Sequence, residues 1–313
     1  MRYYFAPMEG ITDAPYRQVH QSFFPGLTSY YMPFISPTMH RSLTNRESRD
    51  LPLADSVPFR AVPQILTKVP EDFLWAAEAC AQRGYDEVNL NVGCPSGTVV
   101  SKGKGSGMLA DPVKLDEFLG NIFEKSPLPV SVKTRLGMTD AEEFPKILEV
   151  FNQYPIKELT IHPRVRKQFY KGGVDMDMFR YALENSKNSL CYNGNLRTLS
   201  EVRAFEAEFP QIEAVMIGRG LVGNPAMFQP GTSAETIRAF HDCLLETYIE
   251  TFGSARNAIF RLKENWHCMI YLFEDSEKLW KKLRKTTDIA EYRAITAEIF
   301  ATLPMRSELE ADW

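Results

Sequence analysis

Residues 87–107 read EVNLNVGCPSGTVVSKGKGSG, a short apolar run that leads into a segment with five glycines, two lysines and one cysteine. Loops at the ends of buried strands are a usual place for a protein to present reactive groups. Cys94 follows the predicted strand, and a thiol with an ordinary pKa of about 8.5 can donate a proton at neutral pH as well as act as a nucleophile. The glycines, Lys102 and Lys104 suit a lid over an anionic substrate. A flexible surface turn with an incidental thiol is the alternative.

Seven other apolar runs resemble the run at 87–91, and together they predict eight strands. The predicted strands are Tyr3–Ala6, Thr28–Tyr31, Arg60–Ile65, Glu87–Asn91, Val130–Thr134, Glu158–His162, Ser189–Tyr192 and Ala214–Ile217. Their apolar character is nearly continuous, as in parallel strands that are covered on both faces. Helical patterns lie between them, for example Glu71–Arg83, Asp111–Glu124 with Asp111 as its cap, and Ser200–Glu208 with Ser200 as its cap. Eight such units favour a closed (β/α)8 TIM barrel over an open doubly wound sheet.

The pattern changes after Pro230 and Gly231, where helices follow one another with no strand between them. The predicted helices are Thr236–Phe252, Ala255–Phe273, Ser276–Lys285 and Asp288–Leu303. We therefore predict an α/β barrel domain over residues 1–232 and a small all-α helical-bundle domain over residues 233–313.

Composition and charge are those of an ordinary globular protein, with 44% hydrophobic residues, 24% charged residues and a net charge of −4. A nucleic-acid partner would therefore need a local basic patch. The five cysteines form no CxxC pair and no zinc spacing, which favours a reducing compartment and predicts no metal. No apolar run approaches the roughly 20 residues that cross a membrane, and the N-terminus lacks a signal-peptide core. We expect a soluble cytoplasmic protein and favour a monomer.

Polar groups follow seven of the eight predicted strands, at the end where a barrel holds its active site. They are Pro7, Met8, Glu9 and Gly10, then Gln64, Asn91 to Cys94, Lys133 with Arg135, His162 with Arg164, Asn193 to Asn195, and Gly218 with Arg219. The last two groups stand where barrels often bind phosphate, and two tight turns are the alternative.

Lys133 lies in a run that should be buried, so its ammonium needs an anionic or polar partner. A negatively charged cofactor ring or a phosphate would supply one, and a partly solvated lysine at the barrel mouth is the alternative. His162 occupies the matching position on the next strand, which favours a functional role over a structural one.

Residues 218–223 read GRGLVG and fit the GxGxxG pattern of dinucleotide-binding folds. Such a fold needs further parallel strands and an acidic residue at a strand end, and here only helices follow. We therefore reject a dinucleotide-binding fold.

A basic stripe lies in the predicted helical bundle, at Lys278, Lys281, Lys282, Arg284 and Lys285. The preceding helix adds Arg256, Arg261, Lys263, Trp266 and His267. Cations beside an aromatic ring are what a phosphate backbone needs. Acidic residues flank the stripe, however, and on these residues alone a solvated helix face is the favoured interpretation.

Taken together, these motifs resemble the tRNA-dihydrouridine synthases, flavin enzymes that reduce uridine in tRNA. The matching segments are APMEG at 6–10 with Thr12 and Asp13, Gln64, NLNVGCP at 89–95, SVKTRLG at 131–137, His162 with Arg164, NGN at 193–195 and MIGRG at 216–220. They span nearly the whole chain in the correct order, and NVGCP is quite specific. Two positions depart from the family, since Pro163 stands where Gly is frequent and Asn195 where Glu is common.

The resemblance implies FMN at the barrel mouth, NADPH as the reductant and a helical domain that holds tRNA. The implied flavin site comprises Pro7, Met8, Gln64, Lys133, His162, Asn193, Asn195, Gly218 and Arg219. The implied substrate contacts are Asn91, Arg135, Arg164, Arg261 and Lys263. The implied reaction places a hydride from reduced FMN on C6 of uracil and a proton from Cys94, as general acid, on C5.

Three other functions are open to these residues. A flavin barrel enzyme that acts on a free pyrimidine would not need the basic helical region. An RNA-binding protein with an inactive barrel would not need Cys94, Lys133 and His162. An aldolase would use Lys133 as a Schiff base, which borohydride trapping would test.

Overall fold

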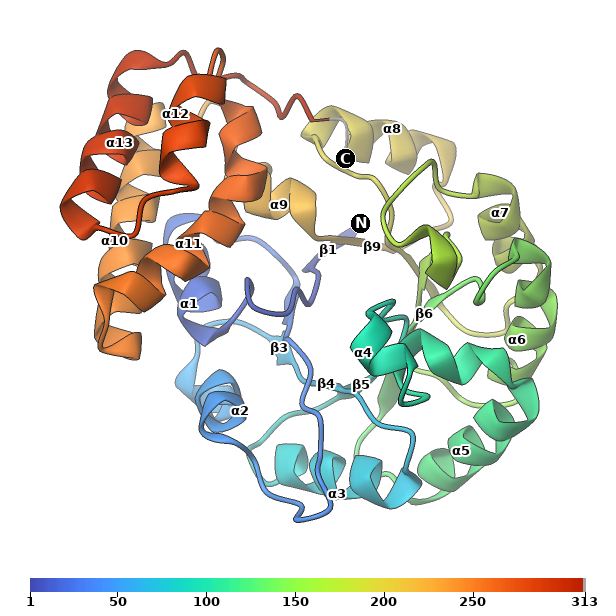
Figure 1. Cartoon of the computed structure of the whole chain (residues 1–313). Coiled ribbons are helices and arrows are strands. Elements are labelled where there is room, and N and C mark those ends of the chain that lie inside the picture. Colours follow the sequence, from blue (N-terminus) through green and yellow to red (C-terminus); the bar gives the residue numbers. More distant parts are fainter. Residues whose placement is uncertain (312–313) are drawn as a thin grey trace.

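Parallel strands form a closed barrel in the computed structural model, which describes residues 1–311 (Figure 1). Within these residues the nine strands are β1 Arg2–Phe5, β2 Ser29–Tyr31, β3 Ala61–Val62, β4 Gln64–Ile65, β5 Val88–Val92, β6 Val130–Arg135, β7 Leu159–His162, β8 Leu190–Tyr192 and β9 Ala214–Ile217. Their hydrogen-bonded order is β3-β2-β1-β9-β8-β7-β6-β5-β4. The predicted (β/α)8 barrel is thereby confirmed.

The third predicted strand, 60–65, is in fact two short strands, because Pro63 between them has no N–H to donate to a ladder. β3 pairs with β2 and β4 pairs with β5, so the two ends of the strand order meet at this proline. The Pro63 carbonyl accepts a hydrogen bond of 2.8 Å from the N–H of Asn89, and the Gln64 carbonyl accepts one of 2.8 Å from Ile35 on the other side. These bonds close the barrel across the break.

Helices lie around the barrel between the strands (Figure 1). They are α1 Ala14–Phe23, α2 Asn45–Asp50, α3 Pro70–Ala81, α4 Gly97–Val100, α5 Pro112–Lys125, α6 Phe144–Phe151, α7 Met176–Asn185, α8 Leu199–Glu208 and α9 Arg219–Gly223. Asp111 caps α5 as predicted, since its side chain accepts from the N–H of Lys114. The predicted cap of α8 was wrong. Thr198, not Ser200, caps this helix, because Thr198 and Glu201 satisfy each other's N–H groups in a capping box.

The glycine-rich segment after β5 is folded rather than an open loop. It contains α4 and a 3-10 turn, η2, at Gly105–Ala110. Ser106 is fully buried, and its N–H and hydroxyl both donate to the carbonyl of Cys94, at 3.1 and 2.8 Å. Gly105 has a φ of +58°, and a Cβ added there would lie 2.9 Å from the Cβ of Cys94. The segment therefore folds back onto the cysteine that it follows, and the turn needs glycine.

The chain after α9 is helical. It comprises α10 Ala234–Phe252, α11 Ala255–Met269 with a 3-10 turn η5 at Ile270–Leu272, α12 Glu277–Leu283 and α13 Ile289–Thr302. α10 packs against α1 and α11 packs against α9, so these two helices lie beside the first and the last helix of the barrel (Figure 1). The hydroxyl of Tyr248 in α10 donates to the cap of α1, Asp13, at 3.0 Å. The predicted helices are confirmed, and the division between residues 232 and 233 stays a prediction.

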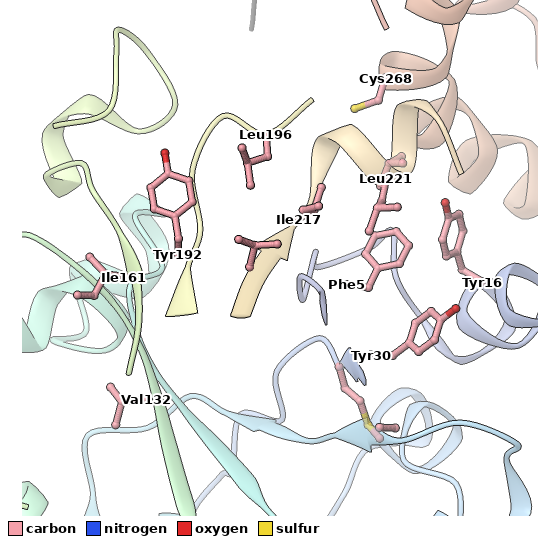
Figure 2. Close-up of a cluster of buried hydrophobic side chains, with 14 of the residues drawn as sticks. Phe5, Tyr16, Tyr30, Val132, Ile161, Tyr192, Leu196, Ile217, Leu221 and Cys268 are labelled. Carbon is pink, nitrogen blue, oxygen red and sulfur yellow. The ribbon is translucent and has the colours of Figure 1, made fainter. Parts of the chain in front are cut away.

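Buried apolar side chains run without a break from the barrel wall into the helices after it. Phe5 of β1 and Tyr16 of α1 lie in the same cluster as Cys268 of α11, which Figure 2 shows above Leu221 of α9. A second, smaller cluster holds Tyr4 and its neighbours inside the barrel. Adjacent residues of β1 therefore belong to different layers, one inside the barrel and one under the helices.

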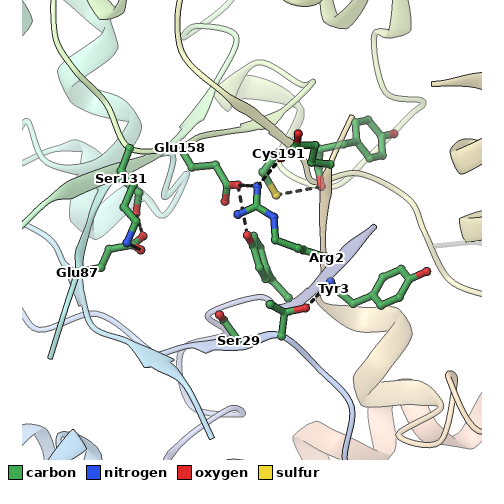
Figure 3. A network of polar contacts seen from close by, with 12 residues as sticks. Arg2, Tyr3, Ser29, Glu87, Ser131, Glu158 and Cys191 are labelled. Carbon is green, nitrogen blue, oxygen red and sulfur yellow. Dashed lines mark hydrogen bonds and ion pairs between the residues drawn. The ribbon is translucent and has the colours of Figure 1, made fainter. Parts of the chain in front are cut away.

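Charged groups fill the barrel at the N-terminal ends of its strands (Figure 3). Arg2 donates to Glu158 at 2.9 Å, while Arg60 and Lys157 each lie 2.7 Å from an oxygen of Glu87. Burial raises the pKa of Glu158 to about 7. Ion pairs thus occupy this end of the barrel, and the opposite end holds a cavity.

Candidate active site

A cavity of about 340 Å³ opens at the C-terminal ends of the strands. This volume lies in the range of small-molecule sites. The predicted site residues that line it are Pro7, Met8, Gln64, Asn91, Cys94, Lys133, Arg135, His162, Arg164, Asn193, Asn195, Gly218 and Arg219. Parallel strands end at the same face of a barrel, which is why residues so far apart in sequence meet here. The cavity brings these residues together, and their individual roles stay predictions.

Two predicted substrate contacts, Arg261 and Lys263, lie on α11 outside this cavity. Arg261 donates to the carbonyl of Gly10 at 2.9 Å and so ties α11 to the loop after β1. The ammonium of Lys263 donates to the carbonyl of Thr286, in the segment between α12 and α13. Both residues therefore have structural contacts that the sequence did not reveal.

The backbone of Cys94 is held on both sides. The side-chain oxygen of Asn91 accepts hydrogen bonds from the N–H groups of Gly93 and Cys94, at 3.1 and 2.9 Å. The carbonyl of Cys94 accepts the two bonds from Ser106 described above. The thiol is half-buried and lines the cavity, so its position is set by folded structure rather than by a mobile turn.

A chain of hydrogen bonds leads from Asn91 into the barrel. Asn91 donates to Gln64 at 2.8 Å, and Gln64 donates to Asn89 at 2.8 Å. Asn89 donates to Ser131 at 2.9 Å, and Ser131 donates to Glu87 at 2.6 Å. The carboxylate of Glu87, paired with two cations, accepts at the end of the chain and so fixes which way each amide points.

Three members of this chain, Asn89, Ser131 and Glu87, were missed by sequence reasoning. Asn89 and Asn91 alternate along β5, and this spacing places both on the same face of the strand. Polar residues at a period of two in an otherwise apolar strand were the signal that pointed into the barrel.

Buried positive charge is the main electrostatic feature of the cavity. Burial and, to a smaller extent, the neighbouring charge of Arg135 lower the pKa of Lys133 to about 8. Burial also lowers the pKa of Arg164. Among residues 1–311, no carboxylate forms an ion pair with Lys133, Arg135 or Arg164. Buried cations without a counter-ion favour an anionic ligand.

Arg164 is buried and surrounded by neutral acceptors. Its guanidinium donates to the Nε2 of His162 at 2.8 Å, to the side chain of Asn195 at 2.9 Å and to the carbonyl of Gly172 at 2.6 Å. Its Nε has no hydrogen-bond partner in the part of the chain that the structure describes. The side-chain oxygen of Asn195 therefore accepts a hydrogen bond from Arg164, and its role toward a cofactor stays a prediction.

The protonation of His162 follows from this contact. Burial lowers its pKa well below the ordinary value, and the neighbouring cations lower it further, so the ring is neutral. An arginine can only donate, so the Nε2 of His162 accepts and its proton lies on Nδ1. Among the described residues this Nδ1–H has no partner, which leaves it available to a ligand.

Arg135 connects two loops at the cavity. It donates to the carbonyl of Gly93 at 3.0 Å, beside Cys94, and to the carbonyl of Phe169 at 2.7 Å, in the loop after β7. Its guanidinium also lies 5.3 Å from the ring centre of Tyr170, and that of Arg219 lies 5.1 Å from it. Tyr170 lines the cavity and was missed, because no sequence pattern sets the course of this loop.

The turns after β8 and β9 bring backbone close to the cavity. A Cβ at Gly220 would lie 2.5 Å from the carbonyl oxygen of Leu196, and one at Gly218 would lie 3.2 Å from the sulfur of Met8. The amide of Asn193 donates to the carbonyl of Met216 at 2.6 Å. The two turns are therefore locked together, and phosphate binding at this place stays a prediction.

Within residues 1–311, no group of three or more His, Cys, Asp or Glu side chains is placed to hold a metal ion. In the same residues, no helix has the length and apolar character that a membrane crossing requires.

Comparisons with known proteins add a family and a fold. The family model described as Dihydrouridine synthase (Dus) matches residues 4–310. A probable tRNA-dihydrouridine synthase of Staphylococcus aureus is 29% identical over 320 residues, which cover 97% of this chain and 95% of that protein. The tRNA-dihydrouridine synthase B of Pasteurella multocida is 30% identical over 229 residues, which cover 73% and 68%. The structure of morphinone reductase in complex with tetrahydroNAD has a TM-score of 0.52 at 11% identity over 73% of this chain and 85% of that one, which shows the barrel fold alone.

Proposed function

Because the chain belongs to the dihydrouridine synthase family, we propose that it reduces uridine in tRNA to 5,6-dihydrouridine, with FMN as cofactor and NADPH as reductant. One observation carries this proposal. The thiol of Cys94 shares a single cavity with the half-buried Lys133 and the buried Arg164, which no carboxylate neutralises within residues 1–311.

The cavity has the chemistry that an anionic flavin needs. Lys133 and the neutral His162 offer N–H donors without partners in the described chain, and the unpaired Nε of Arg164 marks a further unmet donor. A phosphorylated, acidic ring system would supply acceptors for these groups and offset their charge. The residues that would hold it are Pro7, Met8, Gln64, Lys133, His162, Asn193, Asn195, Gly218 and Arg219.

The protein's own groups then have separate tasks. When bound, the flavin reduced by NADPH supplies the hydride for C6 of the uracil ring. Cys94 donates its thiol proton to C5, and solvent restores that proton afterward. Asn91 and Ser106 hold the backbone of Cys94, so the thiol has a fixed place relative to the ring.

Lys133 contributes charge rather than a bond. Next to an anion, the pKa of Lys133 would rise again from about 8, because the counter-charge offsets the cost of burial. Its ammonium would then stabilise negative charge on the bound cofactor. Arg164 donates to the Nε2 of His162 and so selects the tautomer of His162 that carries its proton on Nδ1. We also assign Arg135 and Arg164 to the vicinity of the substrate base.

Exposed cations on the helices after the barrel support the proposal that the protein binds tRNA. Lys278, Lys281, Lys282, Arg284 and Lys285 are exposed, and within residues 1–311 none of them forms an ion pair. The guanidinium of Arg284 lies 5.6 Å from the ring centre of Trp280 on α12. An unpaired basic stripe of this kind binds a phosphate backbone with strong dependence on salt. We extend the proposed tRNA surface to Arg261 and Lys263 on α11.

The decisive experiment uses the purified full chain, NADPH and tRNA transcribed without modifications. We expect bound flavin and formation of dihydrouridine in the tRNA, with no reduction of free uridine. The Cys94→Ala variant should keep its flavin and lose nearly all turnover. Reduction of free uridine but not of tRNA would identify a small pyrimidine as the substrate. A colourless protein with no activity would favour an RNA-binding protein with an inactive barrel. Borohydride trapping of Lys133 with a carbonyl compound would favour an aldolase.

A further inference from the structure

An exposed phenylalanine with unusual backbone geometry, Phe169, immediately precedes Tyr170, which lines the cavity. Phe169 follows the 3-10 turn η4, Arg166–Gln168, in the loop after β7. Its φ is +52°, in the region that favours glycine, and the residue is 39% exposed. Within residues 1–311 it belongs to no apolar cluster. Folding therefore gains little from this side chain at this place, and an outlier of this kind points to function.

The surrounding sequence is basic and aromatic. Residues 164–173 read RVRKQFYKGG, with four cations, two aromatic residues and no acid. Lys167 and Lys171 are exposed, and neither forms an ion pair within the described chain. Aromatic rings set among cations are the usual composition of surfaces that bind single-stranded nucleic acid, where bases stack on the rings.

Two arginines fix the Phe169 residue relative to Cys94. The carbonyl of Phe169 accepts from Arg135, which also donates to Gly93. The guanidinium of Arg166 lies 5.2 Å from the Phe169 ring centre, and its Nε donates to the carbonyl of Pro95 at 3.3 Å. Gly93 and Pro95 flank the cysteine on either side. The Phe169 backbone, through Arg135, and the arginine beside its ring are therefore both connected by hydrogen bonds to residues that flank Cys94 and line the cavity.

We propose that Phe169 and Arg166 form a stacking site for the RNA base that neighbours the reacting uridine. A uridine that enters the cavity must leave its own stack, so the base beside it loses a partner. The Phe169 ring replaces that partner, and Arg166 contributes its flat cationic face and charge near the adjoining phosphate. The inference rests on the proposed function and adds a contact outside the cavity. It assigns the site to RNA rather than to the adenine of NADPH, which offers similar stacking chemistry.

The test compares Phe169→Gly with Phe169→Trp in the full flavin-loaded protein. Glycine suits the φ of +52°, so this variant removes the ring without adding strain. We expect KM for tRNA to rise about 10-fold, which corresponds to about 1.4 kcal/mol and to the stacking of one base. The kcat, the flavin content and the rate of flavin reduction by NADPH should stay unchanged. Tryptophan should keep KM near that of the parent.

A control substitution is Val113→Ala, which trims another exposed apolar side chain, on the outer helix α5. Its KM for tRNA should not change. An unchanged KM in Phe169→Gly would overturn the stacking site while the parent still reduces tRNA. Slower flavin reduction by NADPH in that variant would assign the ring to the reductant and equally overturn the proposal. No activity of the parent on tRNA would instead remove the proposed function.

Discussion

The side-chain oxygen of Asn91 accepts a 2.9 Å hydrogen bond from the backbone N–H of Cys94. The amide nitrogen of the same side chain donates to Gln64, from which the chain of bonds continues to Glu87. The position of the thiol is therefore coupled to the polar interior of the barrel. Substitutions far from the cavity surface can act on Cys94 through this side chain.

Replacement of Asn91 tests this coupling. In Asn91→Ala the N–H groups of Gly93 and Cys94 lose their acceptor, and we expect kcat to fall by about 100-fold, as for a displacement of a reacting group by about 1 Å. Asn91→Asp keeps that acceptor and should recover part of the rate. The rate of thiol alkylation by iodoacetamide, measured without RNA, should change in Asn91→Ala. An unchanged alkylation rate with a raised KM would make Asn91 a contact to the base instead.

Gly105 offers a second way to move the thiol. An added Cβ would lie 2.9 Å from both the Cβ and the carbonyl oxygen of Cys94, so Gly105→Ala should lower kcat at least 10-fold and destabilise the fold by about 1–3 kcal/mol. Gly103→Ala is a matched control, because its φ is +69° but its nearest neighbour is a flexible lysine at 3.5 Å. Gly103→Ala therefore has the same backbone strain from a positive φ, but its added Cβ does not collide with Cys94. Equal loss of turnover in both variants would contradict a specific effect on Cys94.

Some parts of this site follow from sequence and others do not. Lys133 and His162 were predicted because parallel strands carry their ends to one face, whatever the loops between them do. The break at Pro63 was missed, although a proline, which cannot donate to a ladder, stood in the predicted strand. The contact between Arg135 and Phe169 could not be predicted from the sequence. The Arg135 guanidinium donates to the backbone carbonyls of Gly93 and Phe169, in loops whose course depends on tertiary packing, and no local sequence period records that course.

The charge of Lys133 should destabilise the flavin-free protein. The pKa of Lys133 is about 8 in the fold and 10.5 in the unfolded chain, so between these values the unfolded state binds more protons and stability rises with pH. Below pH 8 Lys133 is charged in the folded state as well, and the full cost of burying its ammonium lowers the free energy of unfolding. Lys133→Met should therefore raise the free energy of unfolding at pH 7 by about 1–3 kcal/mol, and by less at pH 9.5. The same variant should bind FMN more weakly.

Urea unfolding of the two flavin-free proteins at both pH values measures this difference. Lys146→Met on α6 is the control, since Lys146 is exposed and should show no such pH-dependent gain. A Lys133→Met protein that is less stable than its parent at pH 7 would show that the ammonium is already well compensated.

Glu158 should make stability fall with rising pH. Burial raises its pKa from 4.5 to about 7, so between these values the folded state binds more protons than the unfolded state. The stabilisation that the protonated Glu158 contributes to the fold is therefore complete below pH 4.5. It falls by up to about 3 kcal/mol as the pH rises through 7. Glu158→Gln removes the titration and should flatten the decline in urea unfolding between pH 5 and 7.5. Asp13, whose pKa burial raises to about 6, is present in both proteins and cancels in their difference. Parallel pH profiles would contradict the assignment.

The basic stripe on α12 should be recognisable by its salt dependence. Each lysine or arginine that neutralises a phosphate contributes about 0.7–0.9 to the slope of log K for tRNA against log salt. Reversal to Glu at Lys281, Lys282 and Arg284 should therefore lower that slope by about 2–3 and weaken binding, while flavin absorbance stays the same. A control variant with the same change in net charge carries Glu in place of three exposed lysines on the outer face of the barrel, Lys125, Lys146 and Lys187. If both triple variants lose affinity equally, net charge rather than this stripe governs binding.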